Sequence, residues 1–114
     1  MRPHSIQFTF KPDISLVEVE MSLHLAMFAI EGLIGRARVR LDAKYHLDEP
    51  NRAITIDAHR PVGRMIARVF TALLLREFGE DAFVGRANEI SQHKPHEVQK
   101  WFLHHFGRAA TNAN

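Results

Sequence analysis

The sequence predicts an α+β fold of the ferredoxin-like kind, a βαββαβ two-layer sandwich in which two helices cover one face of a four-stranded antiparallel sheet. Two observations lead to this expectation. Segments that alternate like strands and segments with helical spacing follow one another in the order βαββαβ, with an extra helix near the C-terminus. The two central strands are joined by a turn, whereas each predicted helix links two strands, as in paired right-handed β-α-β units.

Length and composition indicate one domain. The chain has 114 residues, which is enough to bury a core without disulfides or metal. We expect a single domain over 1–107 with a C-terminal helix over about 95–106, followed by a disordered tail over 108–114. The chain has no cysteine, which excludes disulfide scaffolds and thiol chemistry and is compatible with a reducing cytoplasm. No apolar run is long enough to cross a bilayer, so we expect a cytoplasmic protein with no membrane partner.

Strand-like alternation marks two outer segments of the chain. In residues 5–10, Ile6, Phe8 and Phe10 alternate with polar residues, which predicts a half-buried strand. Residues 82–87 are apolar but short and lie between polar residues, so they predict a weak edge strand.

Residues 14–35 are open to two interpretations. Their apolar residues recur at helical spacing throughout, but over 14–25 they also alternate as in a strand. The ends favour a helix, because Ser15 and Glu18 form a capping-box pattern and Gly35 is a typical C-terminal stop.

A hairpin is predicted next, from Arg38 to a turn at Asp48–Asn51 and back along Ala53–His59. If Leu47 pairs with Arg52, every apolar pair falls on one face of the hairpin. These expected core pairs are Tyr45 with Ile54, Ala43 with Ile56, and Leu41 with Ala58. A helix from Pro61 to about Phe78 should follow, because proline is favoured at the first helical position.

The hairpin register places Asp42 opposite Asp57 on the open face of the sheet, with His59 nearby. Two adjacent carboxylates can share a proton or bind a divalent cation, so these three residues are the catalytic candidates. The favoured interpretation is simpler. Arg40 and Lys44 flank the pair, and a ladder of alternating charges on an exposed surface neutralises itself.

An anion site is the second candidate. Arg60, Arg64 and Arg68 follow one another at helical spacing, and Arg40 lies on the same predicted polar edge. Free N–H groups at a helix start favour an anion, and Gly63 would let a ligand approach closely. The alternative is that these arginines only solubilise the helix.

The sequence contains no nucleophile–base motif and no nucleotide-binding fingerprint, so we expect no cofactor and no metal site. The histidines at 93, 96, 104 and 105 are too widely spaced to hold one ion together. The favoured function is a non-catalytic domain that forms a homodimer or binds a protein partner through its open sheet face or its C-terminal helix. One alternative is an enzyme or binding domain for a small anionic metabolite. The other is sequence-independent binding of nucleic acid through arginines.

Overall fold

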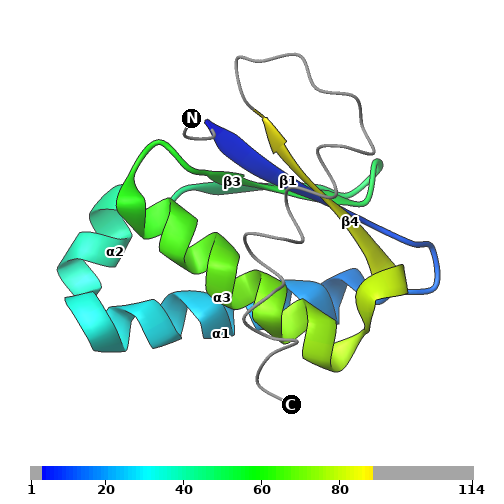
Figure 1. Ribbon diagram of the computed structural model, residues 1–114, viewed down its shortest axis with the longest axis horizontal. Helices are drawn as coiled ribbons and strands as arrows, with labels where there is room; N and C mark the ends of the chain where they lie inside the picture. The colour runs from blue at the N-terminus through cyan, green and yellow to red at the C-terminus, as the bar shows by residue number, and fades with distance from the viewer. Residues whose placement is uncertain (1–3, 89–114) are drawn as a thin grey trace.

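A computed structural model describes residues 4–88 of the chain (Figure 1). The strands are β1 (Ser5–Phe10), β2 (Tyr45–Asp48), β3 (Ala53–Asp57) and β4 (Phe83–Asn88). The helices are α1 (Leu16–Ile34), α2 (Arg36–Asp42) and α3 (Pro61–Glu77), and a short 3-10 helix, η1 (Glu80–Ala82), precedes β4. The predicted C-terminal helix over 95–106 and the tail over 108–114 lie outside the described residues.

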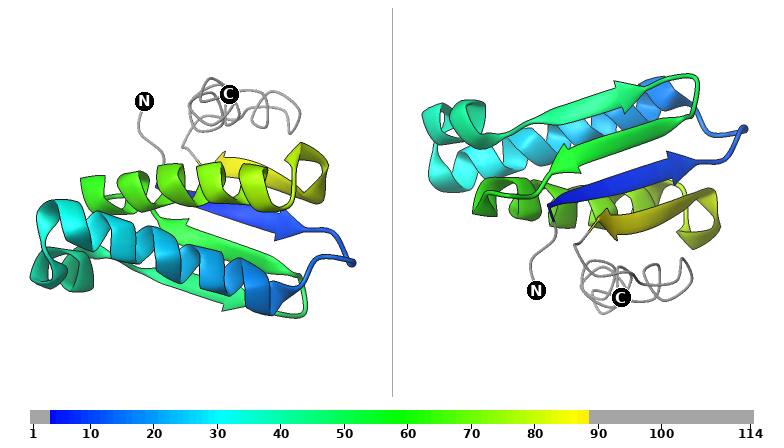
Figure 2. Two further views of the ribbon diagram at one scale, coloured as in Figure 1. Left: turned by 90° about the horizontal axis from the view of Figure 1, so that it is seen from below. Right: turned by 90° about the horizontal axis from the view of Figure 1, so that it is seen from above.

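The four strands form one antiparallel sheet in the order β2-β3-β1-β4. β4 is an edge strand, as the sequence predicts. Helices α1 and α3 lie side by side on one face of the sheet, whereas no helix of the described residues covers the other face (Figure 2). The expectation of an α+β protein with an antiparallel four-stranded sheet is therefore confirmed.

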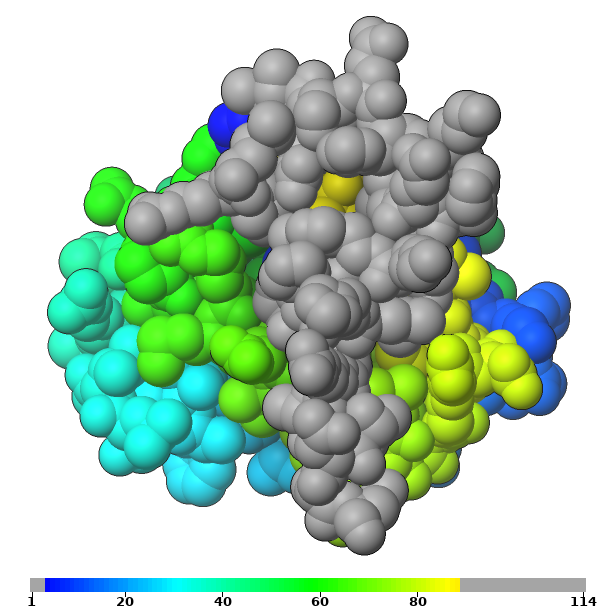
Figure 3. Space-filling view, viewed as in Figure 1, coloured from blue at the N-terminus to red at the C-terminus, as the bar shows by residue number. Residues whose placement is uncertain are grey.

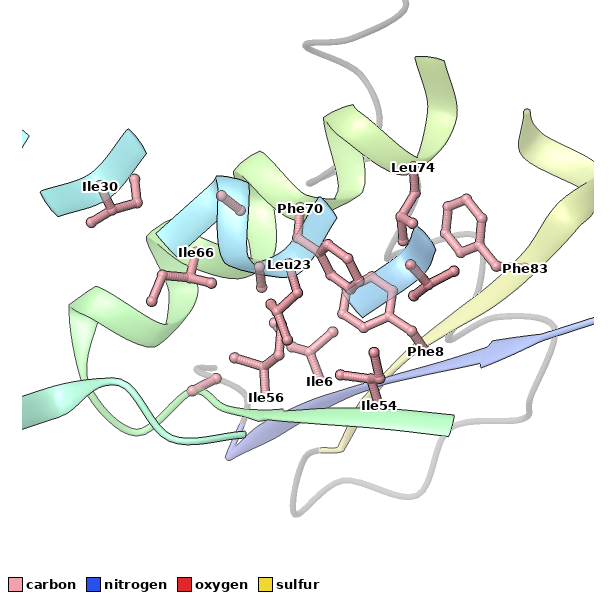
Figure 4. Packing of buried hydrophobic residues seen from close by; sticks show 14 of the residues in the cluster. Ile6, Phe8, Leu23, Ile30, Ile54, Ile56, Ile66, Phe70, Leu74 and Phe83 are labelled. Atoms are coloured by element: carbon pink, nitrogen blue, oxygen red, sulfur yellow. The ribbon is translucent and has the colours of Figure 1, made fainter. Parts of the chain in front are cut away.

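The core fills the space between the helices and the sheet (Figure 4). Ile6 and Phe8 of β1 are fully buried, as their alternation predicts. The ring of Phe8 meets the ring of Phe70 in α3 edge-on, with 4.8 Å between centroids, and Leu23 of α1 belongs to the same cluster. Burying side chains of this size contributes roughly 1.5–3 kcal/mol each, so this layer is the main source of stability.

The ambiguous segment after β1 is the helix α1. Ser15 caps it, because its Oγ accepts a hydrogen bond from the backbone N–H of Glu18 at 3.3 Å. Gly35 ends it with a φ of 97°, a conformation that glycine adopts without steric cost. Helix α3 also starts as predicted, with Pro61 at its first position, and Gly79 follows its end with a φ of 88°.

The strand predicted from Arg38 to Asp42 is wrong, because residues 36–42 form helix α2. The alternation of arginine with apolar residues in this segment imitates a strand, but alanine, arginine and leucine are also good helix formers. In the helix, Val39 is buried, and Ala43, four residues later, packs against the core. Leu41 falls on the opposite side and is 76% exposed, so its predicted place in the core is also wrong.

The register of the hairpin differs from the prediction as well. Tyr45 pairs with Ile56 and Leu47 pairs with Ile54, so the loop spans residues 49–52. The alternation of faces cannot distinguish the two registers, because the partner of each β2 residue moves by two positions along β3. Asp48 stabilises the observed turn by accepting hydrogen bonds from the backbone and side-chain nitrogens of Asn51, at 3.3 and 2.8 Å.

Candidate functional site

An open hollow of about 370 Å³ lies where β1 begins and β3 ends. The right panel of Figure 2 shows this end of the sheet, beside the start of β1 (blue). The hollow is lined by His4, Ser5, Lys44, Tyr45, His46, Thr55, Asp57 and His59. Most of these residues carry hydrogen-bond donors, and three of them are imidazoles that can gain a positive charge.

His4 and His59 contact each other directly within this hollow. His4 Nδ1 lies 3.2 Å from His59 Nε2, and the two rings meet edge-on with 4.5 Å between centroids. The backbone holds this pair together, because the N–H of Ala58 donates to the carbonyl of His4 at 2.9 Å. Asp57 Oδ1 accepts the backbone N–H of His59 at 2.9 Å, which fixes the chain between them. The histidine pair is therefore a product of the β1–β3 pairing.

The predicted carboxylate pair does not form. Asp57 stands opposite Ser5 of β1, and its backbone N–H donates to the carbonyl of Lys44 at 2.9 Å. Asp42 ends helix α2, where its Oδ2 lies 4.0 Å from Nε of Arg38. Of the three catalytic candidates, the structure therefore places Asp57 and His59 at the hollow, and Asp42 does not line it.

At the start of α3, two members of the predicted anion site, Arg64 and Gly63, contact the protein's own backbone. Arg64 uses its guanidinium to bind the protein itself, donating to the carbonyls of Ala58 at 2.7 Å and His59 at 3.2 Å. Gly63 is buried, and a Cβ atom there would lie 1.8 Å from the carbonyl oxygen of Asp57. The glycine therefore admits the protein's own backbone, and the space beside it is unavailable to a ligand.

The other predicted anion-binding arginines do not join the hollow. Arg60 is the exposed N-cap residue of α3, and Arg68 is exposed further along the same helix. Arg40 lies exposed on α2, so the predicted contact with His59 across a hairpin is absent. Sequence reasoning missed His4 as a member of the site, because its position depends on the pairing of β1 with β3. His4 could have been identified from the sequence only by predicting that β1 pairs with β3.

A second surface stands out on the helix layer. Val17, Met21, Leu25 and Phe28 form a stripe on α1 that faces away from the sheet, and they are 70%, 65%, 56% and 70% exposed. The opposite side of the same helix is buried in the core through Val19, Leu23, Ala26 and Ile30. A surface helix normally has a polar outer face, and a helix that is apolar on both sides is usually covered on both.

A groove of about 380 Å³ runs beside this stripe, between α1 and the end of α3. It is lined by Met21 and Leu25 of the stripe, by Glu18 and Ser22, and by Glu77 and Phe78. The left panel of Figure 2 looks onto this helix layer. The stripe and the groove together form one apolar surface, which we call the α1 surface.

Charges are distributed unevenly along the α1 surface. Glu18 and Glu20 lie near the start of α1 and Glu31 lies near its end, and the helix contains no lysine or arginine. Beyond its end, α2 carries Arg36, Arg38 and Arg40 with Asp42 as its single acid. In the space-filling view, α2 and the end of α1 (cyan) lie at the surface of the molecule (Figure 3). The start of α1 is therefore acidic, whereas the arginines of α2 follow its other end, over a helix length of roughly 28 Å.

Tyr45 links α1 to the sheet instead of joining the core. It is 37% exposed, and its hydroxyl lies 3.0 Å from Nε2 of His24 on α1. Partial burial raises the pKa of the Tyr45 phenol above its ordinary 10.0, and the negative charge of Glu20 adds to the effect. The phenol thus stays protonated, and its polar contact with His24 joins β2 to α1.

Comparisons of the chain with protein-family models, with curated proteins and with solved structures find no match. Within residues 4–88, no three histidine, aspartate or glutamate side chains are arranged to hold a metal ion. The helices of this part of the chain are also too short or too polar to cross a membrane.

Proposed function

We propose that this protein is a self-associating domain whose α1 surface packs against the same surface of a second copy. The exposed stripe of Val17, Met21, Leu25 and Phe28 carries the proposal. Two protomers would contribute eight such side chains, and covering their exposed parts would contribute roughly 8–16 kcal/mol. That is comparable to the roughly 4–15 kcal/mol that association costs in lost freedom of movement.

Charge complementarity favours a second copy as the occupant. A twofold axis that passes near Leu25 and is perpendicular to α1 would place the two α1 helices antiparallel in an isologous interface, in which the same surface of each copy is used. The acidic start of one α1, at Glu18 and Glu20, would then lie near Arg36 and Arg38 of the partner's α2. In this arrangement the α1 surface and the neighbouring α2 of each copy supply both signs of charge, so no other molecule is needed to balance them.

We further propose that the domain is ferredoxin-like and acts in the cytoplasm. The sheet order β2-β3-β1-β4, with α1 connecting β1 towards β2 and α3 connecting β3 to β4, supports the first point. The lack of cysteine supports the second. This architecture hosts many functions, so it adds no argument for any particular activity.

Light scattering coupled to size-exclusion chromatography tests the association directly. The expected mass is twice the 13.1 kDa of one chain. Leu25→Glu should convert the protein to a monomer, because it would bury a carboxylate at the centre of the interface. Val84→Glu is the matched control, since Val84 is similarly exposed at 49% but lies on β4.

Two results would overturn the proposal. One is a wild-type chain that remains monomeric at its highest soluble concentration. The other is a Val84→Glu variant that dissociates as readily as Leu25→Glu. Circular dichroism confirms that each variant is folded before its mass is compared.

A further inference from the structure

We propose that the hollow at the start of β1 binds a small oxyanion, a phosphate or sulfate group, between His4, His59 and Lys44. This binding site is independent of the proposed self-association, because it lies at an end of the sheet and not on the outer face of α1. Its volume of about 370 Å³ exceeds that of the anion alone, so it has room for a small organic body attached to a phosphate.

The donors of the hollow fit an oxyanion better than a cation. Imidazole nitrogens from His4 and His59 lie side by side, with His4 Nδ1 and His59 Nε2 3.2 Å apart, so one oxygen can contact both. Ser5 and Thr55 add hydroxyl groups from neighbouring strands, and Lys44 adds an ammonium group. These imidazole, hydroxyl and ammonium groups can donate several hydrogen bonds to a phosphate or sulfate, which accepts hydrogen bonds at every oxygen.

The contact between the two imidazoles makes anion binding depend on protons. A neutral imidazole can accept a hydrogen bond from its neighbour, whereas two protonated imidazoles at this distance repel each other. A bound dianion offsets that repulsion, and each protonated ring in turn strengthens the anion's binding. Protonation of His4 and His59 and binding of the anion therefore favour one another.

Other charged groups near His4 and His59 also contribute to the net charge of the hollow. Lys44 and His46 face the hollow from the β2 side, and Asp57 faces it from β3. Asp57 already accepts the backbone N–H of His59 through one oxygen, and Lys44 brings a charge of the opposite sign to the same hollow. Arg64 of α3 donates a hydrogen bond to the carbonyl of His59. The protonation of the imidazoles thus decides how positive the hollow becomes, and affinity should rise as the pH falls below neutrality.

Calorimetric titration with sulfate tests the site, since sulfate keeps its charge over the pH range in which an ordinary imidazole gains a proton. The protein should carry no tag at its N-terminus, which is close to His4. We expect sulfate to bind at about pH 6 and at least fivefold more weakly at about pH 8. His59→Gln should weaken binding at the lower pH by about fivefold or more. Arg68→Gln is the control, because it removes an exposed cation that does not line the hollow.

The outcomes are distinct. Loss of sulfate binding in His59→Gln, with binding retained in Arg68→Gln, supports the site. Repeating the titration with inorganic phosphate and with ribose 5-phosphate then shows whether the free anion or an organic phosphate is preferred. Equal weakening in both variants would mean that sulfate responds only to overall charge, and the proposal would fail. Absence of any heat at the lower pH would overturn it too. A Leu25→Glu monomer should still bind sulfate, which separates this site from the α1 surface.

Discussion

The carbonyl oxygen of Asp57 occupies the space that a Cβ atom on Gly63 would need, at a distance of 1.8 Å. This close approach lets the first turn of α3 lie directly against the end of β3. Arg64 reinforces the same junction by donating to the carbonyls of Ala58 and His59. The position of His59 at the hollow therefore depends on Gly63, because the backbone of β3 occupies the space where any other residue would have its Cβ atom.

Replacing Gly63 with alanine should destabilise the protein strongly. The new methyl group would meet a backbone carbonyl that cannot rotate away, so the cost should be at least the roughly 1–3 kcal/mol of an overpacked core. Gly32→Ala is the matched control, because Gly32 also lies within a helix but a Cβ there has nothing within 4 Å. That variant should be more stable by about 0.5–1 kcal/mol. Urea unfolding measures both changes, and similar stabilities for the two variants would contradict the geometry at Gly63.

The single tyrosine of the chain allows the environment of Tyr45 to be measured. Its phenolate absorbance should appear with a midpoint above pH 10.0, because partial burial raises the pKa of Tyr45 and Glu20 raises it further. Glu20→Gln should lower the midpoint without bringing it to 10.0, since burial is the larger cause. An unchanged midpoint in Glu20→Gln would show that the two side chains do not interact.

The raised pKa of Tyr45 also predicts how stability changes in alkali. The folded protein holds the phenol proton more tightly than the unfolded chain does. The resulting stability is therefore complete below pH 10.0 and is lost as the pH rises through the higher folded pKa. Tyr45→Phe should remove this part of the alkaline decline, as thermal unfolding over a pH series would reveal. A decline of the same size in Tyr45→Phe would assign it to other groups.

Acid should weaken the turn between β2 and β3. The side-chain and backbone hydrogen bonds from Asn51 hold the pKa of Asp48 below its ordinary 3.8. The stability from this carboxylate is present above pH 3.8 and is lost as the pH falls through the lower folded pKa. Asn51→Ala should raise the pKa of Asp48 towards 3.8 in a carboxyl NMR titration, because it removes the largest cause of the shift. Glu49→Gln, in the same loop, should leave the pKa of Asp48 low.

Local signals in the sequence are sufficient for most elements of this fold. The alternation of Ile6 and Phe8 specifies β1, and the cap at Ser15 together with Gly35 specifies the limits of α1. Proline at position 61 does the same for the start of α3. In each case the signal and the structure that it specifies lie within a few residues, so neighbouring elements are not needed to interpret it.

Helix α2 shows where local signals become ambiguous. Its arginines and apolar residues satisfy the pattern of a strand, but as a helix it brings Val39 and Ala43 onto the side that meets the core. Whether residues 36–42 form a helix or a strand depends on how much of Val39 can be buried against α1, α3 and the sheet. The buried area of Val39 is defined only once these elements have packed together. The loss of the predicted Asp42–Asp57 pair follows from the same choice.

Local sequence placed Asp57 and His59 near one another, and its capping signals favoured a helix over residues 14–35. It did not place His4 beside His59, because residues far apart in the chain meet only when β1 pairs with β3. It also did not show which side of α1 would be covered. The tertiary structure decides both points, since burial and strand pairing depend on the elements that surround a residue and not on its neighbours in the chain.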